Sequence, residues 1–370
     1  MAILVKMKLT SLYLLILAAC ASVPQVNTSS ESFSQPHQSK VQKIGEIPLD
    51  NGKAKLYFLN RQVGWFFDQG SLWTTADGGS VWEIVYSASA NEQTIEKVEF
   101  VNSYLGWMIK GGALFRTEDS GRTWTPMPVP ISFPHGELRD FKFLADGKVG
   151  WIAGGLYRPV SQREILQSPN NAISPDSKAV LEGAILRTDD GGERWRQQSL
   201  PNGEAYRFLQ LYFFDAKHGI ALGDTGVVYT LTGGDPWKTA NFRKGCVDQQ
   251  YRQTAEGRPI NVFFLDSNKG WLSFTDGYVA KSDDGGRTWC DLLHPEDVWS
   301  TSSYNTFFQK IIFTDESHGW GLGADGTLYE TTDKGVMWAK YEASVKFDDI
   351  FFLNADQGWA VAKNILYRIG

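Results

Sequence analysis

Five aspartates recur at one position of a repeated motif and are the residues that most resemble catalytic carboxylates. The motif reads S/T-x-D-x-G-x-x-W, and its aspartates are Asp77, Asp119, Asp190, Asp284 and Asp333. Paired carboxylates perform general acid–base chemistry. Here each aspartate lies near a glycine that can adopt positive φ, where a carboxylate accepts backbone N–H bonds within a turn. We therefore expect these aspartates to be structural, with the following tryptophan packed as an apolar plug between strands.

A sialidase-like site would need three arginines around a substrate carboxylate, together with a tyrosine nucleophile and acidic residues. The repeats show where such a site would lie, because a polar residue stands three positions before a phenylalanine that all repeats share. These polar residues are Lys55, Lys97, Asp140, Gln210, Asn261, Lys310 and Asp349. No arginine stands among them, and the five histidines are scattered singly. We expect no enzymatic activity, no metal and no cofactor, and a carbohydrate-binding or sialidase-like protein remains the alternative.

The N-terminus predicts export and lipidation. Lys6 and Lys8 precede an apolar run that is too short to span a membrane but suits a signal peptide. The run ends at Leu17-Ala-Ala-Cys20, which resembles the lipobox of bacterial lipoproteins and implies that Cys20 is lipidated. An ordinary cleaved signal with a chance cysteine is the alternative. We expect a signal peptide over residues 1–19, a lipidated Cys20 with a flexible tether over residues 20–40, and one domain over residues 41–370.

Two further cysteines, Cys246 and Cys290, would lie in an exported and oxidising compartment. We expect them to form a disulfide, and two buried free thiols are the alternative.

The domain consists of repeats. Seven apolar segments end in a shared phenylalanine followed by a glycine, and six of these glycines precede tryptophan; the phenylalanines are Phe58, Phe100, Phe143, Phe213, Phe264, Phe313 and Phe352. Each repeat has the length of one propeller blade, four short strands joined by turns. The aspartate motif is the Asp-box, which is degenerate in the fourth repeat, where Thr232 replaces the aspartate. The pattern predicts an all-β, seven-bladed β-propeller, with six blades as the alternative.

The seventh repeat has no Asp-box, because the chain ends before a fourth strand. Residues 41–50 have a strand-like apolar pattern. We expect them to supply that strand in the last blade and so to close the ring without an open edge.

Six Asp-box copies interleaved with Gly-Trp strands resemble the photosystem II stability/assembly factor family. The resemblance covers nearly all of residues 41–370 and implies a non-enzymatic assembly factor for a membrane protein complex. It also implies an exported, lipid-anchored protein, on the periplasmic side of the outer membrane or in the thylakoid lumen. A net charge of −6 argues against a nucleic-acid partner. The expected partner is a membrane protein or envelope complex, bound by a monomer that its lipid anchors to the membrane.

Three connections are longer than their equivalents, and all three are predicted on one face of the ring. They lie near residues 156–183, 243–259 and 294–305. Long loops commonly carry function, although drift in unconstrained loops gives the same pattern. Arginine and aromatic residues are frequent anchors of interfaces. The partner-binding residues predicted on this face are Arg139, Tyr206, Arg207, Arg258, Trp299 and Tyr304.

Overall fold

The computed structural model describes residues 41–48, 54–89, 94–130, 136–161, 163, 178–201, 207–243, 257–292 and 307–369. Residues Met1–Gln38 and Ser39–Gly370 form separate units, and every described residue belongs to the second unit. The signal peptide, the lipidation site and the tether predicted over residues 1–40 therefore lie outside the described residues.

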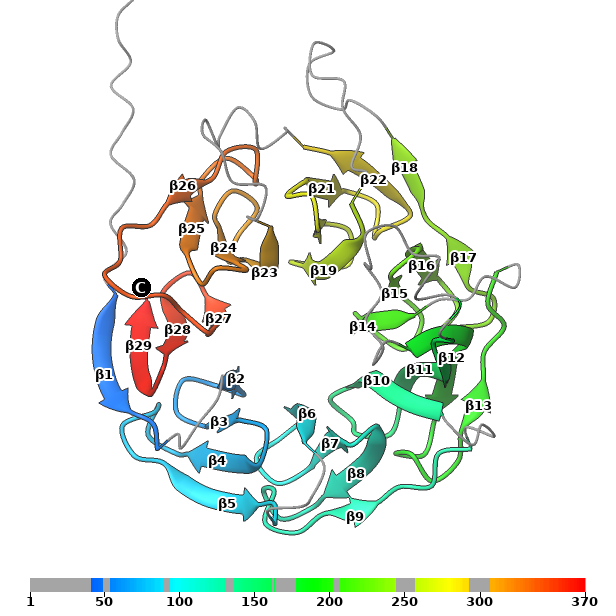
Figure 1. The fold of residues 1–370 in the computed structure, drawn as a ribbon, viewed down its shortest axis with the longest axis horizontal. Helices are drawn as coiled ribbons and strands as arrows, with labels where there is room; N and C mark the ends of the chain where they lie inside the picture. Colours follow the sequence, from blue (N-terminus) through cyan, green and yellow to red (C-terminus); the bar gives the residue numbers. More distant parts are fainter. Residues whose placement is uncertain are drawn as a thin grey trace, which may run out of the picture. The chain divides into compact units, whose positions relative to one another are not determined.

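Seven sheets are arranged in a ring, each contributing one blade, and their strands pair antiparallel except at the outer edge of blade 5 (Figure 1). Blades 1 and 2 comprise β2 (Lys55–Phe58), β3 (Gly64–Phe67), β4 (Ser71–Thr75) and β5 (Glu83–Ser87), then β6 (Ile95–Phe100), β7 (Gly106–Lys110), β8 (Ala113–Thr117) and β9 (Thr125–Pro126). Blades 3 and 4 comprise β10 (Gly136–Phe143), β11 (Gly150–Pro159), β12 (Lys178–Thr188) and β13 (Arg196–Gln197), then β14 (Phe208–Phe213), β15 (Gly219–Gly223), β16 (Gly226–Thr230) and β17 (Lys238–Thr239).

Blade 5 comprises β19 (Pro259–Phe264), β20 (Gly270–Phe274), β21 (Val279–Ser282) and β22 (Thr288–Asp291), with β18 (Asn241–Arg243) as a fifth strand. Blade 6 comprises β23 (Phe308–Phe313), β24 (Gly319–Gly323), β25 (Leu328–Thr331) and β26 (Ala339–Lys340). Blade 7 comprises β27 (Asp349–Asn354), β28 (Gln357–Ala362), β29 (Ile365–Ile369) and β1 (Gln42–Glu46).

The N-terminal strand closes the ring. β1 pairs antiparallel with β29, with Gln42 opposite Arg368 and Glu46 opposite Ile365, and becomes the outermost strand of blade 7. The prediction of a seven-bladed propeller closed by an N-terminal strand is confirmed. The segment completes a blade that the end of the chain would otherwise leave with three strands.

The shared phenylalanine explains the glycine that follows it. In each blade the Phe ring lies directly on the glycine of the next strand: a Cβ added to Gly106, for example, would lie 2.5 Å from Cδ1 of Phe100. The same overlap occurs at the equivalent glycine of all seven blades. Only a residue without a side chain fits there, so the Phe and the Gly form one packing unit.

The tryptophans join neighbouring blades through the same ring. The Trp of each Gly-Trp pair stacks face to face on the Phe of the next blade, as Trp65 does on Phe100 at 3.9 Å between centroids. Six of the seven junctions contain such a pair, and Ile220 replaces the tryptophan at the junction of blades 4 and 5. The Asp-box Trp contacts the Phe of its own blade edge-on, at 5.6 to 6.2 Å. Each aromatic pair adds ~0.5–1.5 kcal/mol beyond area burial, so the repeated motif stabilises both blades and junctions.

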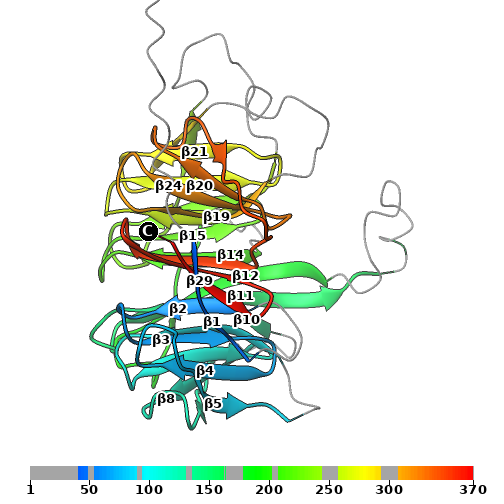
Figure 2. The same ribbon diagram turned by 90° about the vertical axis from the view of Figure 1, so that its left-hand side faces the viewer.

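Two elements depart from the repeat. β18 leaves blade 4 and pairs in parallel with β22 at the outer edge of blade 5, with Phe242 opposite Trp289. In blade 3, β11 and β12 continue as a hairpin to Pro159 and Lys178, so the ends of the segment predicted as a long loop are paired strand. Figure 2 shows this hairpin projecting beyond the neighbouring blades.

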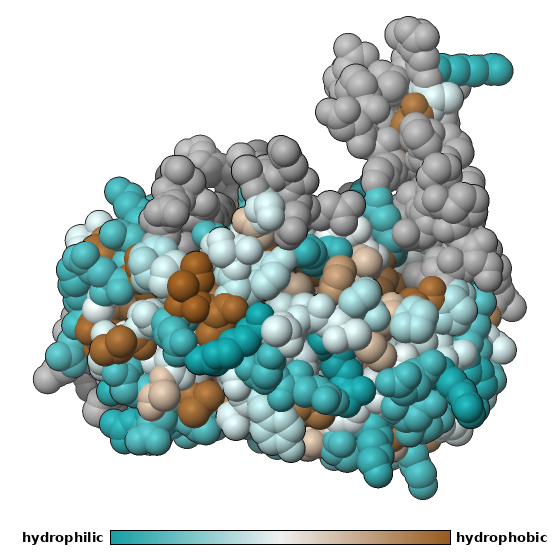
Figure 3. Space-filling model, turned by 90° about the horizontal axis from the view of Figure 1, so that it is seen from below, coloured by the Kyte–Doolittle hydropathy of each residue, from teal (hydrophilic) through white to brown (hydrophobic). Residues whose placement is uncertain are grey.

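Because successive strands alternate in direction, the connections separate onto two faces of the ring. The Asp-box turns and the turns before each Gly-Trp strand lie on one face, which we call the box face. The turns after each Gly-Trp strand and the connections between blades lie on the opposite face, the loop face. On the side of the ring that Figure 3 shows, most of the coloured surface is hydrophilic or intermediate, with several apolar side chains among it.

Candidate functional site

The seven polar residues of the inner strands link the blades. At each junction one of them makes a hydrogen bond or ion pair with the next blade. Lys55 Nζ donates to Glu96 O, while Lys97 and Lys310 pair with the carboxylates of Asp140 and Asp349. At the other four junctions a backbone N–H donates to the side chain: Leu211 to Asp140, Val262 to Gln210, Ile311 to Asn261, and Leu56 to Asp349. These residues therefore hold the ring together, and Lys97 and Lys310 are neutralised by carboxylates rather than available to a ligand.

An ionic network lies at the junction of blades 2 and 3. Lys97 pairs with Asp140, while Lys142 pairs with Glu99, whose side chain is 12% exposed. Burial opposes ionisation of Glu99, but the ammonium groups of Lys142 and Lys97 hold its pKa below the ordinary value. Burial raises the pKa of Asp140, although Lys97 and the Leu211 N–H favour its charged form. Opposite charges compensate one another across this junction, which makes the network structural.

The Asp-box aspartates accept hydrogen bonds within their turns. Asp77 Oδ1 accepts from the Thr75 hydroxyl at 2.8 Å and from Val81 N at 3.0 Å. Asp119, Asp190, Asp284 and Asp333 accept equivalent bonds from the turn. Bonds from the Thr123 hydroxyl and backbone lower the pKa of Asp119 to about 2, and bonds led by Val81 N lower that of Asp77. Each of the five carboxylates is thus already engaged within its own turn.

Three of the predicted partner-binding arginines lie at the loop-face ends of adjacent inner strands. Arg139 is in β10, where its guanidinium donates to Glu137 Oε2 at 2.8 Å; its side chain is 31% exposed. Arg207 and Arg258 immediately precede β14 and β19 and are exposed. Tyr206, Trp299 and Tyr304 lie outside the described residues. Blades 3, 4 and 5 therefore bring these arginines to one side of the loop face, but Arg139 is already paired within its strand.

The backbones of the two exposed arginines are fixed by the turn of their own blade. Arg207 N donates to Asp224 Oδ1 at 3.0 Å, and Asp224 N donates to Arg207 O at 3.1 Å. Arg258 N donates to the Thr275 hydroxyl and Arg258 O accepts from Thr275 N, both at 2.9 Å. Within the described part of the chain, neither guanidinium forms a hydrogen bond or ion pair. Both side chains are therefore carried on a fixed backbone and are unpaired within the described ranges, while the nearby carboxylates of Asp224 and Asp276 accept backbone N–H bonds.

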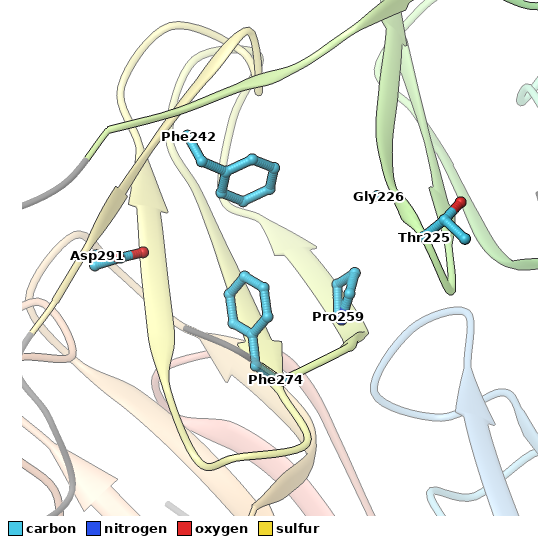
Figure 4. A pocket seen from close by; sticks show the side chains of 7 residues that line it. Thr225, Gly226, Phe242, Pro259, Phe274 and Asp291 are labelled. Carbon is cyan, nitrogen blue, oxygen red and sulfur yellow. The ribbon is translucent and has the colours of Figure 1, made fainter. Parts of the chain in front are cut away.

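A groove of about 170 Å³ lies next to the backbone segments that carry these two arginines. It lies between the β15–β16 turn of blade 4 and the edge of blade 5, and it is lined by Thr225, Gly226, Phe242, Gly257, Pro259, Phe274 and Asp291 (Figure 4). Gly257 and Pro259 flank Arg258 in sequence, and Thr225 follows the Asp224 that holds Arg207. The sequence pattern did not predict this groove. Its one signal was the long connection over residues 243–259, which begins directly after Phe242.

Cys290 in β22 is disulfide-bonded. Cys20 and Cys246 lie outside the described residues, so the pairing of Cys246 with Cys290 stays a prediction. The described ranges contain no group of three or more His, Cys, Asp or Glu side chains placed to hold a metal ion. No described helix is long and apolar enough to cross a membrane.

Comparison with known proteins supports the resemblance found in the motifs. The chain matches no protein-family model. It is 27% identical over 193 residues to photosystem II assembly protein Ycf48 of Thermosynechococcus vestitus, covering 50% of this chain and 51% of the relative. It is 26% identical over 186 residues to photosystem II assembly lipoprotein Ycf48 of a Nostoc species, covering 48% and 49%. The chain thus spans about half the length of the curated relatives it matches.

Solved structures share the whole fold. YCF48 bound to D1 peptide superimposes with a TM-score of 0.61 at 20% identity, over 91% of this chain and 99% of that one. An ancestral GH74 enzyme superimposes with a TM-score of 0.57 at 11% identity, over 88% of this chain and 46% of the enzyme. At these identities the superpositions establish the propeller alone. Taken with the sequence matches, they agree with the similarity that the motifs indicated: this chain folds as a seven-bladed β-propeller and is similar to the photosystem II assembly proteins named Ycf48.

Proposed function

We propose that this protein is a non-enzymatic, membrane-anchored interaction module that assists assembly of a membrane protein complex. The observation that carries the proposal is the pair of exposed guanidiniums at Arg207 and Arg258, held on fixed backbones at adjacent blades. Arginines on rigid supports are effective anchors for a protein partner because little conformational freedom is lost on binding. The inner-strand polar ring and the Asp-box carboxylates are already engaged within the fold, which supports the loop face as the proposed binding surface.

The relatives support this class of function. The curated matches are photosystem II assembly proteins, and one superimposed relative binds a D1 peptide. We infer by analogy that the partner here is a membrane protein or a complex containing one. Lipidation of Cys20 would hold the propeller at the membrane, on the periplasmic side of the outer membrane or in the thylakoid lumen.

The proposal is tested by capture of partners from detergent-solubilised membranes of the source organism. Wild-type protein should recover a membrane protein that the double variant Arg207→Ala/Arg258→Ala does not. A matched control is Arg61→Ala/Arg194→Ala, which removes two exposed arginines from turns of the box face. Equal recovery by wild type and both variants would remove the loop face from consideration.

Carbohydrate binding is the second function, because a GH74 enzyme shares the propeller. We infer that this chain lacks hydrolase activity, since its five repeated aspartates all accept hydrogen bonds within their own turns. A glycan array together with chromogenic glycosidase substrates tests both parts. Hydrolysis of a chromogenic substrate would contradict the absence of hydrolase activity. If the hydrolysis persisted after substitution of the Asp-box aspartates, the hydrolase site would lie elsewhere.

A further inference from the structure

We propose that the groove between blades 4 and 5 binds an extended acidic peptide segment by accepting one of its bulky apolar side chains. This inference rests on the proposed function and names the chemistry of the partner. It is carried by the groove walls, the two unpaired arginines that flank the groove, and the strand edge beside it.

The walls are aromatic and partly exposed to solvent. The Phe242 side chain is 45% exposed although it lies in a strand, and its ring contacts the buried Phe274 ring edge-on at 6.1 Å. Figure 4 shows the two rings pointing toward each other, with Pro259 beside them and Thr225 across the gap on blade 4. An exposed ring above a buried ring is a surface on which an apolar side chain gains contact area and excludes water.

The size of the groove matches one side chain. Its volume is about 170 Å³. An apolar cavity of ~150 Å³ accommodates a benzene-sized molecule, so the groove is large enough for one phenylalanine, leucine or methionine side chain. The groove is therefore suited to a single anchor residue and not to a broad apolar interface.

The surrounding charge selects acidic neighbours for that anchor. Arg258 stands between two lining residues, and Arg207 is bonded to the turn that supplies Thr225 and Gly226. Both guanidiniums are unpaired among the described residues, and guanidinium binds carboxylate in a bidentate manner. Asp291 lines the other side of the groove, away from Thr225 (Figure 4). The carboxylates of the partner should therefore lie on the blade 4 side of its apolar anchor.

The edge of β18 favours a polypeptide over a small acid. β18 is the outermost strand of its sheet, and no described strand pairs with its free side. An exposed strand edge offers backbone N–H and C=O groups that an extended chain can satisfy. Main-chain pairing beside a side-chain pocket is a common mode of peptide recognition.

Gly226 allows the groove to be filled without truncating the core. A Cβ at Gly226 meets no atom within 4 Å, so Gly226→Leu would place a side chain in open space at the groove wall. Gly70 occupies the equivalent turn of blade 1 and is equally unobstructed, which makes Gly70→Leu a matched control. Phe242→Ala removes an aromatic ring from the groove wall. Its control is Met337→Ala, because Met337 is a large apolar residue of the box face that is 47% exposed.

The experiment selects random peptides displayed on phage against the purified full-length chain, then measures fluorescent versions of enriched peptides by anisotropy. Enriched sequences should share a bulky apolar residue next to Asp or Glu. Their Kd should rise ~tenfold or more in Phe242→Ala and in Gly226→Leu, and stay unchanged in both controls. Arg258→Ala should raise the Kd of the acidic peptide more than the Kd of the same peptide with its Glu residues replaced by Gln. Thermal melting of each variant checks that the propeller is intact.

Several outcomes would overturn the inference: no enrichment, peptides with basic flanks, or peptides that bind Gly226→Leu as well as wild type. Binding that appears only when residues 247–255 are replaced by a short linker would assign the groove to the chain's own segment. Any of these results could occur while Arg207→Ala/Arg258→Ala still loses capture of the membrane protein. That combination would contradict the groove inference and leave the proposed function supported.

Discussion

At the scale of single residues, the glycine beneath each shared phenylalanine is a tightly constrained position of the fold. Gly106→Ala should lower the free energy of unfolding by ~1–3 kcal/mol, because the new methyl group overlaps the Phe100 ring, which is itself clamped by Trp65. Urea unfolding followed by tryptophan fluorescence measures the loss. Gly70→Ala is the control, since a Cβ there meets nothing within 4 Å. Equal stability of the two variants would contradict the packing explanation.

The Asp-box carboxylates should give the protein an acid-sensitive component of stability. Bonds from Thr123 lower the pKa of Asp119 from 3.8 to about 2 in the folded state. The stabilisation is therefore fully present above pH ~4 and is lost as the pH falls toward 2, because the unfolded chain binds the proton first. The free energy of unfolding of wild type should fall more steeply over this window than that of Asp119→Asn. Parallel slopes would show that Asp119 is not hydrogen-bonded in this way.

The sequence predicted which residues of the site recur in each repeat. It did not predict which neighbouring side chains and backbone groups they contact. The polar ring position is recognisable in the sequence because it lies three residues before the shared phenylalanine. Its role in linking blades depends on contacts such as the bond from Leu211 N to Asp140 in the neighbouring blade, which the sequence does not show. Arg139 was predicted to bind a partner, yet it pairs with Glu137. A bulge between Leu138 and Asp140 interrupts the strand register at this point, and the inner strands of four other blades have a bulge at the equivalent position.

At the scale of elements, the repeats specified almost every strand, while the added strand β18 escaped prediction. Its parallel pairing with β22 is a tertiary contact between a connection and the next blade, and only three residues take part. The groove was missed for the same reason, because Phe242 and Phe274 belong to different segments that the fold brings together. Local periodicity identifies blades well, but it carries no information about what covers a blade's outer edge.

The disulfide at Cys290 should stabilise the outer edge of blade 5. Arg243, the last residue of β18, lies opposite Cys290 in β22 and precedes Cys246 by three residues in the sequence. We expect Cys246 to be the partner, and Cys290→Ser to lower the free energy of unfolding by ~2–4 kcal/mol. Mass spectrometry of non-reduced tryptic peptides should find the Cys246–Cys290 cross-link. Two alkylated free thiols in unreduced protein would disprove the pairing.

The closing strand β1 should matter more to stability than the residues before it. Ile44 packs with the buried Leu366 of β29, and Gly45 approaches the backbone of the blade 1 Asp-box turn at Gly79. Deleting residues 42–46 would uncover the edge of β29, so we expect a lower melting temperature and self-association through the exposed edge. Calorimetry and light scattering measure both effects. Deleting residues 21–40 should change neither.

At the scale of the whole molecule, we expect the ring to bind the partner and the predicted lipid anchor to hold the protein at the membrane. A single substitution at Cys20 can test whether the two properties are independent. Lipidation of Cys20 would hold the propeller at a membrane through a tether whose composition indicates flexibility. Cys20→Ser should move the protein from the detergent phase to the aqueous phase in Triton X-114 partitioning. Its melting temperature should not change, because Cys20 precedes every residue of the ring. Unchanged partitioning would mean that the resemblance to a lipobox is accidental. Retained peptide binding by the released protein would show that recognition resides in the ring and that the anchor supplies only proximity to membrane partners.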